Sequence, residues 1–431
     1  MGRLGRATVA AVLLASVGAA CGGGDDDTGA TGGTAGTGAG PADGADVVRI
    51  GVAVPDLEAF ATLNPRFSIG DPEEQVEAVL QAWRRDERLP LHGRDIEFVY
   101  RSYNIINDDD KLAACTGFAQ DDEVFAVIAG RDFSTGSQCL ADRFDIPVID
   151  TNPTQDSVYA RLPSLFTMRT SETRMLRAFA SWADGEGLLE GRSLGVFWDT
   201  RSEEAVNALR EALAGLGVEI TSEVSSSGEG VGSPQDQIAV QRFQDDGVDT
   251  VLLLVGGSSV TNFMTFAGRQ GYSPDYLDLE FAGHIGDVFS SSLDPEQYDG
   301  TTAMAISRTG GIAAGHELSE VQQTCIDDFE AFSGQDLAVE SPESGELVHV
   351  LQTCDITSVL LAGLEGAGEE LTAESFVAAL EEIQDMELAA WGNLGFGPDD
   401  HSGVDVFRTI AWSADCVCWE ALDEEFQPLP E

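Results

Sequence analysis

Short apolar runs alternate with amphipathic stretches along most of the chain. Val47–Val54 (VVRIGVAV) is typical of a buried strand, and 72–87 carries apolar residues at helical spacing from Val76 to Trp83. This alternation predicts successive β-α units and therefore a parallel sheet. The same unit is expected to hold strands at 96–100, 124–129 and 147–150, a helix that opens at Asp108, and a helix over 134–144.

The pattern starts again at residue 172, which predicts a second α/β unit. Its expected helices cover 172–182, 203–216, 235–244 and 261–269, and its expected strands cover 194–198, 218–224, 251–255 and 279–281. The remainder predicts a strand at 301–306, helices at 317–332, 345–366 and 373–383, and a strand at 404–412 that forms a terminal hairpin with the 416–418 segment. Two doubly wound α/β lobes carry their ligand loops at the carboxyl ends of the strands, next to the crevice between the lobes.

The first 20 residues predict an export signal. Arg3 and Arg6 precede a short apolar run at 7–16, and small residues follow at 18–20. The run is shorter than the roughly 20 residues of a membrane-spanning helix. Cys21 comes directly after these small residues, so the segment resembles a bacterial lipoprotein cleavage site with Cys21 as the lipidated residue. Plain cleavage after Ala20 is the alternative.

Residues 21–46 predict a flexible tether. The segment consists mainly of Gly, Ala, Thr and Asp and contains no aromatic residue, so it cannot bury a core of its own. A lipid anchor, a flexible tether and a globular body together are typical of a protein held at a membrane surface.

The seven cysteines agree with an exported chain, because six remain once Cys21 is assigned to lipid. Six cysteines allow 15 connectivities. Their spacing suggests Cys115–Cys139 and Cys325–Cys354, which leaves Cys416 and Cys418 for each other. A metal site is the rival interpretation, but the sequence contains no Cys-x-x-Cys pair and no His at ligand spacing from a Cys.

Composition narrows the classes of function. The chain has 431 residues, 75 acidic against 23 basic, and a formal net charge of −52. This excludes a nucleic-acid binder, which needs clustered cations, while 43% hydrophobic residues suffice for globular cores. Lys111 is the single lysine, so P-loop and Schiff-base chemistry would have to depend on it.

No enzymatic motif fits its predicted context. Gly191–Gly195 matches G-x-S-x-G, but it precedes a strand instead of following one, as a nucleophile elbow would. The five histidines are dispersed, and no H-E-x-x-H occurs. We therefore expect neither an enzyme nor a cofactor or metal site.

Two segments carry a family resemblance: VFAVIAGRDFSTGSQCLADRFDIPVIDTNPT (124–154) and SLGVFWDTRSEEAVNALREALAGLGVEI (193–220). Together with the signal, the Cys and the tether, they resemble type I periplasmic solute-binding proteins, in particular the branched-chain amino acid-binding subfamily of ABC importers. The resemblance implies two doubly wound parallel-sheet lobes joined by a three-segment hinge. It places the first lobe at 47–168 plus 286–390 and the second at 169–285 plus 391–431. A disulfide comparable to Cys115–Cys139 also occurs in the family.

The resemblance also implies a ligand site built from strand-end loops. Its candidate residues are Asp56, Phe60, Arg131, Ser134, Thr135, Asn152, Thr154, Trp198, Ser202, Ser258 and His284.

Some of these residues have alternative interpretations. Ser134 and Thr135 open a predicted helix, whose free N–H groups suit a ligand carboxylate; a plain N-cap is the alternative for Ser134. Arg131 either pairs with a ligand anion or forms a structural salt bridge. His284 stands where amino acid-binding members carry a Glu for the ligand ammonium, and it is otherwise an ordinary loop histidine.

These features predict an exported monomer anchored by Cys21 to the outer face of the cell membrane. The expected function is capture of a small polar solute, of amino acid, amide or carboxylate type, and its delivery to the permease subunits of an ABC importer. An extracellular sensor of the same fold that signals to a membrane receptor is the alternative, followed by an exported hydrolase.

Overall fold

The computed structural model describes residues 46–57, 68–227, 233–281, 285–290, 292–312, 314–337, 345–423 and 425–430. Residues 41–431 form one compact unit. The predicted export signal, Cys21 and the tether up to residue 45 lie outside the described residues, as do Phe60 and His284.

The first sheet has five strands, all parallel, in the order β2-β1-β3-β4-β5. The strands β3, β4 and β5 are short and buried at every position, as expected for a sheet covered by helices on both faces, whereas β1 and β2 are longer. They are β1 (Asp46–Asp56), β2 (Arg94–Asn104), β3 (Ala126–Ala129), β4 (Val148–Asp150) and β5 (Leu165–Thr167).

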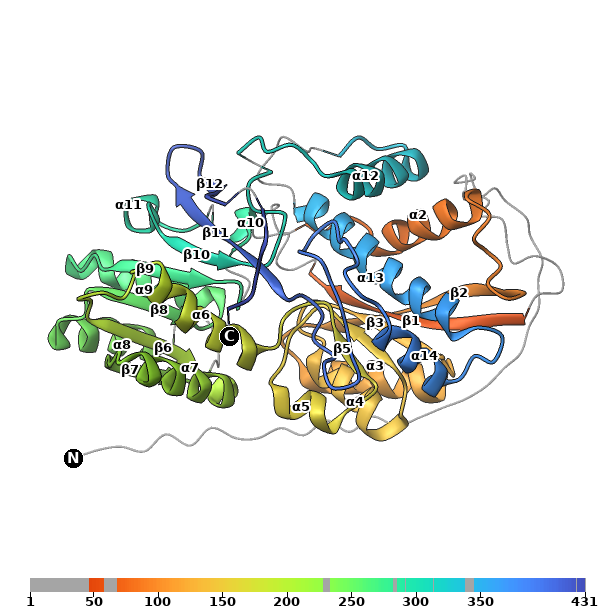
Figure 1. Cartoon of the computed structure of the whole chain (residues 1–431), viewed down its shortest axis with the longest axis horizontal. Helices are drawn as coiled ribbons and strands as arrows, with labels where there is room; N and C mark the ends of the chain where they lie inside the picture. The colour runs from red at the N-terminus through yellow and green to blue at the C-terminus, as the bar shows by residue number, and fades with distance from the viewer. Residues whose placement is uncertain are drawn as a thin grey trace, which may run out of the picture. The chain divides into compact units, whose positions relative to one another are not determined.

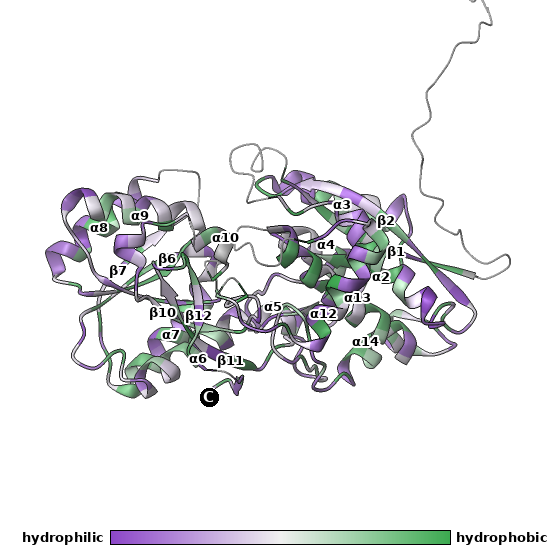
Figure 2. Cartoon of the chain, turned by 90° about the horizontal axis from the view of Figure 1, so that it is seen from above, coloured by the Kyte–Doolittle hydropathy of each residue, from purple (hydrophilic) through white to green (hydrophobic). Residues whose placement is uncertain are grey.

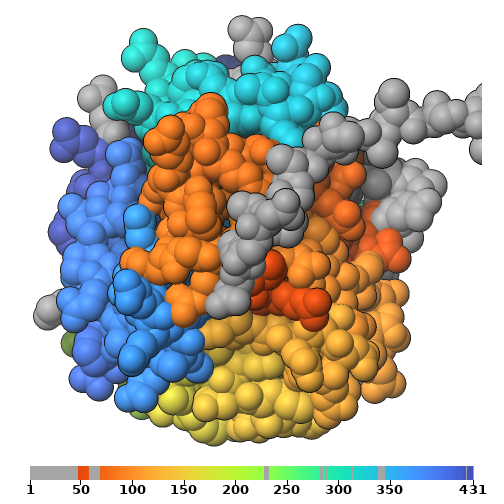
Figure 3. All heavy atoms as spheres, turned by 90° about the vertical axis from the view of Figure 1, so that its right-hand side faces the viewer, coloured from red at the N-terminus to blue at the C-terminus, as the bar shows by residue number. Residues whose placement is uncertain are grey.

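Helices from two distant parts of the sequence cover this sheet. The first group is α2 (Pro72–Arg85), α3 (Asp108–Gln120), α4 (Ser134–Phe144) and α5 (Asp156–Arg161). The second group is α12 (Glu320–Ser333), α13 (Gly345–Ala367) and α14 (Ala373–Glu381). On one face of the molecule α2 lies beside α12 and α13, although they are far apart in the sequence (Figure 3).

The second sheet has eight strands and follows the path β12-β11-β10-β9-β8-β6-β7, with β13 paired to β11. Strands β6 to β10 run parallel, and β11 and β12 add an antiparallel edge. The strands are β6 (Leu194–Asp199), β7 (Ile220–Ser226), β8 (Thr250–Leu254), β9 (Asp275–Leu279), β10 (Thr302–Ala305), β11 (Val406–Ser413), β12 (Cys418–Ala421) and β13 (Gln427–Pro428).

The helical segments that accompany this sheet are mostly amphipathic. Hydrophobic and hydrophilic stretches lie next to each other on the helices that flank both sheets (Figure 2). The segments are α6 (Glu172–Gly185), the 3-10 turn η2 (Thr200–Ser202), α7 (Glu203–Leu216), α8 (Pro234–Asp246), α9 (Gly257–Gln270), α10 (Asp287–Ser290) and α11 (Pro295–Tyr298).

We call the first sheet with its helices the first lobe and the second sheet with its helices the second lobe. The chain passes between them three times: after β5, after β10 and after α14 (Figure 1). The crossing segments pair with one another, because Thr167 accepts a backbone hydrogen bond from Gly403 at 3.0 Å and Ile306 accepts one from Gly392 at 2.8 Å. The expected fold of two doubly wound parallel-sheet lobes with a three-segment connection is therefore confirmed.

Two predicted boundaries are wrong. Residues 286–390 were expected to belong to the first lobe, but β10 pairs with β9 and β11, so the crossing comes after this strand. The strand expected at 279–281 is β9, which ends at Leu279. The acidic residues in DYLDLEF are unusual in a buried strand, so the sequence pattern does not indicate where β9 begins. Asp278 can be buried there because the Tyr298 hydroxyl donates a hydrogen bond to its carboxylate at 2.6 Å.

Disulfides and one long helix consolidate the lobes. The disulfides join Cys115 to Cys139, Cys325 to Cys354 and Cys416 to Cys418, as the spacing suggested. The first bond links α3 to α4, the second links α12 to α13, and the third joins the turn before β12 to the first residue of that strand. Among the described residues, α13 alone has the length and hydropathy of a membrane span, yet 67% of that window is buried inside the protein, where α13 contacts α2 and β3.

Candidate functional site

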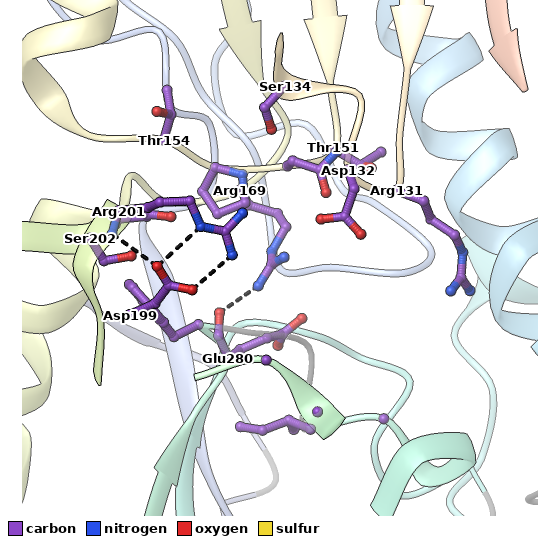
Figure 4. A pocket seen from close by; sticks show the side chains of 18 of the residues that line it. Arg131, Asp132, Ser134, Thr151, Thr154, Arg169, Asp199, Arg201, Ser202 and Glu280 are labelled. Carbon is purple, nitrogen blue, oxygen red and sulfur yellow. Dashed lines mark hydrogen bonds and ion pairs between the residues drawn. The ribbon is translucent and has the colours of Figure 1, made fainter. Parts of the chain in front are cut away.

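A cavity of about 750 Å³ is lined by residues from both lobes. Its walls come from the loops that follow β3 and β4 in the first lobe and β6, β8 and β9 in the second. The carboxyl ends of parallel strands meet along one edge of each sheet, which is where such folds bind ligands. Figure 4 shows the main polar side chains of this cavity.

The loop after β3 has an unusual backbone. Arg131 and Asp132 have φ values of +40° and +65°, which residues other than glycine rarely adopt. The Tyr103 hydroxyl stabilises this loop, because it lies against the carbonyl of Gly130 and 2.8 Å from the carbonyl of Arg131. The first turn of α4 follows this loop directly and lines the cavity.

Ser134 and Thr135 are the first two residues of α4, and both line the cavity. Phe133 is the N-cap and provides no side-chain hydrogen bond, so the alternative in which Ser134 caps the helix is wrong. The first N–H groups of a helix have no partner within it. Thr135 donates its hydroxyl to Asp108 at 3.1 Å, whereas Ser134 faces the cavity (Figure 4).

The loop after β4 is organised by a buried carboxylate. Asp150 accepts hydrogen bonds from the backbone and side-chain nitrogens of Asn152 at 2.8 and 2.9 Å and from the Ser137 hydroxyl at 2.5 Å. Burial raises the pKa of Asp150, and these donors oppose that shift. Thr154 lies further along the loop, where its N–H donates to the Tyr159 hydroxyl at 2.9 Å.

An ion pair marks the end of β6. Asp199 accepts from the backbone N–H of Arg201 at 2.9 Å and from its guanidinium at 2.8 and 3.1 Å. Glu172 lines the same wall, and burial raises its pKa to about 7, opposed by a hydrogen bond from Ser202 and by the charges of Arg169 and Arg201. This wall therefore carries a carboxylate that titrates near neutral pH.

Arg169 and Glu280 form a hydrogen bond between a crossing segment and the second lobe at the cavity wall. Arg169, just after β5, donates to the Glu280 carbonyl, just after β9 (Figure 4). The Glu280 carboxylate accepts from the backbone N–H groups of Ile306 and Ser307 at 3.1 and 2.8 Å. Burial raises the pKa of Glu280, and the charge of Arg169 lowers it.

Six of the sequence-predicted residues line the cavity: Arg131, Ser134, Thr135, Asn152, Thr154 and Ser202. Three others do not, and each for a local reason. Asp56 is exposed at the end of β1. Trp198 points into the core, where Arg210 lies 5.1 Å from its ring centroid, and Asp199 takes the strand-end position instead. Ser258 is exposed because α9 begins at Gly257, four residues earlier than expected, and presents backbone to the cavity.

Several cavity residues were missed from the sequence. Arg169, Glu280 and Trp391 come from the crossing segments or the ends of strands whose limits were misplaced. Gln352 comes from α13, which only the return of the chain to the first lobe brings to the cavity. Asp199 follows Trp198 at the same predicted strand end, so the sequence offers both as candidates, and of the two only Asp199 lines the cavity.

No metal-ion site is evident in the part of the chain that the structure describes, since no three His, Cys, Asp or Glu side chains group closely enough. The cavity instead offers hydroxyls, backbone N–H groups, three arginines and several carboxylates. This donor set can bind a polar organic molecule by hydrogen bonds and ion pairs.

A family model described as "Periplasmic binding protein" matches residues 70–416. The chain belongs to the periplasmic binding protein family. No curated protein sequence matches it.

Solved structures agree on the type I periplasmic binding protein fold. A branched-chain amino acid ABC transporter protein from Thermus thermophilus with bound valine is 15% identical, with a TM-score of 0.66, covering 90% of this chain and 97% of the other. An ABC transporter solute-binding protein from Rhodopseudomonas palustris in complex with 3,4-dihydroxybenzoic acid is 14% identical (TM-score 0.65; 90% and 98% covered). A type 1 periplasmic binding protein from Bordetella pertussis is 17% identical (TM-score 0.65; 90% and 100% covered).

Proposed function

We propose that this periplasmic binding protein captures a small polar solute in the cavity between its lobes and delivers it to an ABC importer. The observation that carries the proposal is the cavity itself, which gathers hydrogen-bonding groups from the strand ends of both lobes beside the three crossing segments. Hinge closure around a ligand is a recurrent motion of two-lobed binding proteins. Binding without catalysis is the mechanism.

The solute class is an amino acid, an amide or a carboxylate. Structural neighbours with bound valine and with bound dihydroxybenzoic acid support this range, because both ligands are small and carry a carboxylate. Ser134, Thr135, Asn152, Thr154, Ser202 and Arg131 are the proposed contacts. Phe60 and His284 remain predicted contacts outside the described residues.

A thermal-shift screen of amino acids, amides, polyols, carboxylates and short peptides tests the proposal. A ligand at 100 times its Kd stabilises the folded state by about 2.7 kcal/mol, which shifts Tm measurably. Small-angle scattering should then show a smaller radius of gyration with the bound solute. Ser134→Ala and Thr154→Ala should weaken binding of that solute, while Ser258→Ala, at an exposed position near the cavity, should not.

A screen in which no solute raises Tm, or a bound solute that leaves the radius of gyration unchanged, would contradict the transport mechanism. Turnover of a bound solute would contradict the non-enzymatic assignment.

We also propose that the protein is an exported lipoprotein held at the outer face of the membrane through Cys21. Metabolic labelling with a fatty acid should label the wild type and not Cys21→Ser. Labelling of the variant would contradict the anchor.

A further inference from the structure

Arg131 has no salt bridge among the described residues, and the carboxylate of Asp132 acts on it only at longer range. No ion pair or hydrogen bond from its guanidinium is found there, and its Nε is buried without a partner. Burial lowers the pKa of Arg131, and the charge of the neighbouring Asp132 opposes this shift. Figure 4 shows its side chain directed away from the neighbouring Asp132 and from the Asp199–Arg201 pair.

The other two cavity arginines are engaged. Arg201 is paired with Asp199, and Arg169 donates to the Glu280 carbonyl. A chain with 75 acidic residues has many ways to neutralise an arginine. The structural salt bridge considered for Arg131 is therefore absent from the described part of a protein that could easily have formed one.

Arg131 stands where two cavities adjoin. It lines the 750 Å³ cavity and also a smaller one of about 50 Å³, which is lined mainly by residues of β1, β3, α2 and α13. Thr151 and Gln352 line both cavities as well. The remaining wall of the smaller cavity is mostly apolar, apart from His349 and Thr353.

His349 is a neutral acceptor at this junction. Gln75 donates its amide N–H to the Ile69 carbonyl at 2.6 Å, so its amide oxygen faces His349 Nδ1 at 2.6 Å. Nδ1 must therefore carry the proton, which leaves Nε2 as an acceptor. Burial and the charge of Arg131 lower the pKa of His349 to about 3, so the imidazole does not add a second cation.

The backbone supports the same interpretation. Arg131 and Asp132 keep positive φ values, and the Tyr103 hydroxyl stabilises them. Strained residues persist where the surrounding structure over-determines them, and such positions cluster at ligand sites. The fold therefore holds one unpaired guanidinium at a defined place on the cavity wall.

We propose that Arg131 is the anion receptor of the cavity, so that the solute must be an organic acid whose carboxylate pairs with this guanidinium between β3 and α13. The inference rests on the proposed function and narrows its solute class. Arginine suits the role because its planar fork binds a carboxylate through two parallel hydrogen bonds. The helix start at Ser134 then binds another part of the solute.

Matched acids and amides test the proposal by thermal shift and calorimetry: isovalerate and isovaleramide, benzoate and benzamide, glutarate and glutaramide, leucine and leucinamide. In every pair that contains a ligand, the acid should be the compound that raises Tm, and it should bind at least ten times more tightly than the matched amide. Arg131→Gln should weaken the best acid at least tenfold. Arg131→Lys should lie between the two, because it keeps the charge but loses the fork. Arg143→Gln, at the exposed far end of α4, should bind like the wild type.

Three results would overturn the inference: an amide that binds as tightly as its acid, an Arg131→Gln protein with undiminished acid affinity, or no stabilisation by any acid. If Arg131→Gln does not fold, the proposal is tested by the comparison of acids with amides on the wild type and by the acid affinity of Arg131→Lys. A neutral polyol or peptide that binds independently of Arg131 would leave the proposed function standing without the inference. A complete lack of binding in the broad screen would remove both.

Discussion

Ser157 of the first lobe is hydrogen-bonded to Glu204 of the second. The Ser157 backbone N–H donates to Glu204 Oε1 at 3.1 Å, and its hydroxyl donates to Oε2. Gln155 adds a side-chain hydrogen bond to the Arg201 carbonyl at 2.5 Å. The start of α5 and the start of α7 are thus connected beside the cavity, at residues that must separate if the lobes move apart there.

Glu204→Ala should loosen this connection. Exposed charged contacts contribute about 0.2–1 kcal/mol, so the Ser157 amide should exchange its hydrogen roughly 1.4 to 5 times faster. Hydrogen exchange with mass spectrometry on the peptide that contains α5 measures the effect. Glu211→Ala, about two turns further along α7, serves as the control. Equal exchange in the wild type and Glu204→Ala would show that the contact does not hold the two segments together.

Glu172 should make stability depend on pH near neutrality. Its pKa rises from 4.5 to about 7 on folding. Between these values the folded protein holds a proton that the unfolded chain has released, so the contribution of Glu172 to the free energy of unfolding decreases as pH rises and is constant above about pH 7. The slope is at most about 1.4 kcal/mol per pH unit.

Urea unfolding of wild type and Glu172→Gln at pH 5, 6, 7 and 8 checks this dependence. The stability difference between the two proteins should shift in favour of the variant as pH rises to 7 and then stay level. Glu203→Gln, at the exposed start of α7, should run parallel to the wild type. A parallel curve for Glu172→Gln would contradict the prediction.

The Cys115–Cys139 disulfide should stabilise the protein more than Cys416–Cys418. Cys115 and Cys139 are buried and 24 residues apart, whereas the other pair is only two residues apart. Loop-closure entropy gives about 3.5 kcal/mol for the longer loop and about 1.6 kcal/mol for the shorter. Chemical unfolding of the two double Cys→Ser variants measures the contribution of each disulfide to the free energy of unfolding. An equal loss of stability in both variants would contradict the prediction.

Gly136→Ala should disturb the loop that carries Arg131. A Cβ at Gly136 would lie 2.3 Å from the ring of Phe133, which is fully buried and has its centroid 4.7 Å from that of Tyr103. Overpacking of this kind costs about 1–3 kcal/mol, and it should also weaken solute binding because Tyr103 stabilises the Arg131 backbone. Gly185→Ala, with no neighbour within 4 Å, is the control. Unchanged Tm and solute affinity in Gly136→Ala would show that the ring can move freely.

Local patterns in the sequence determined the order of most strands and helices, although they did not indicate α5 or β5. The helices over Ser134–Phe144 and Glu203–Leu216 begin and end where the pattern predicted, because amphipathic periodicity and terminal residues are local properties. The disulfide pairs were also suggested by spacing. Six cavity residues are among the candidates that the family resemblance implied, because relatives of the same fold place their ligand loops at the carboxyl ends of the strands.

Tertiary structure decided what these patterns cannot encode. The place of β10 depends on pairing with β11, about 100 residues later, and Gln352 reaches the cavity only because α13 packs back on the first sheet. Arg131 shows the same limit: whether an arginine is paired depends on which acids the fold brings near it. In a chain with 75 acidic residues, only the three-dimensional arrangement leaves that guanidinium without a partner among the described residues.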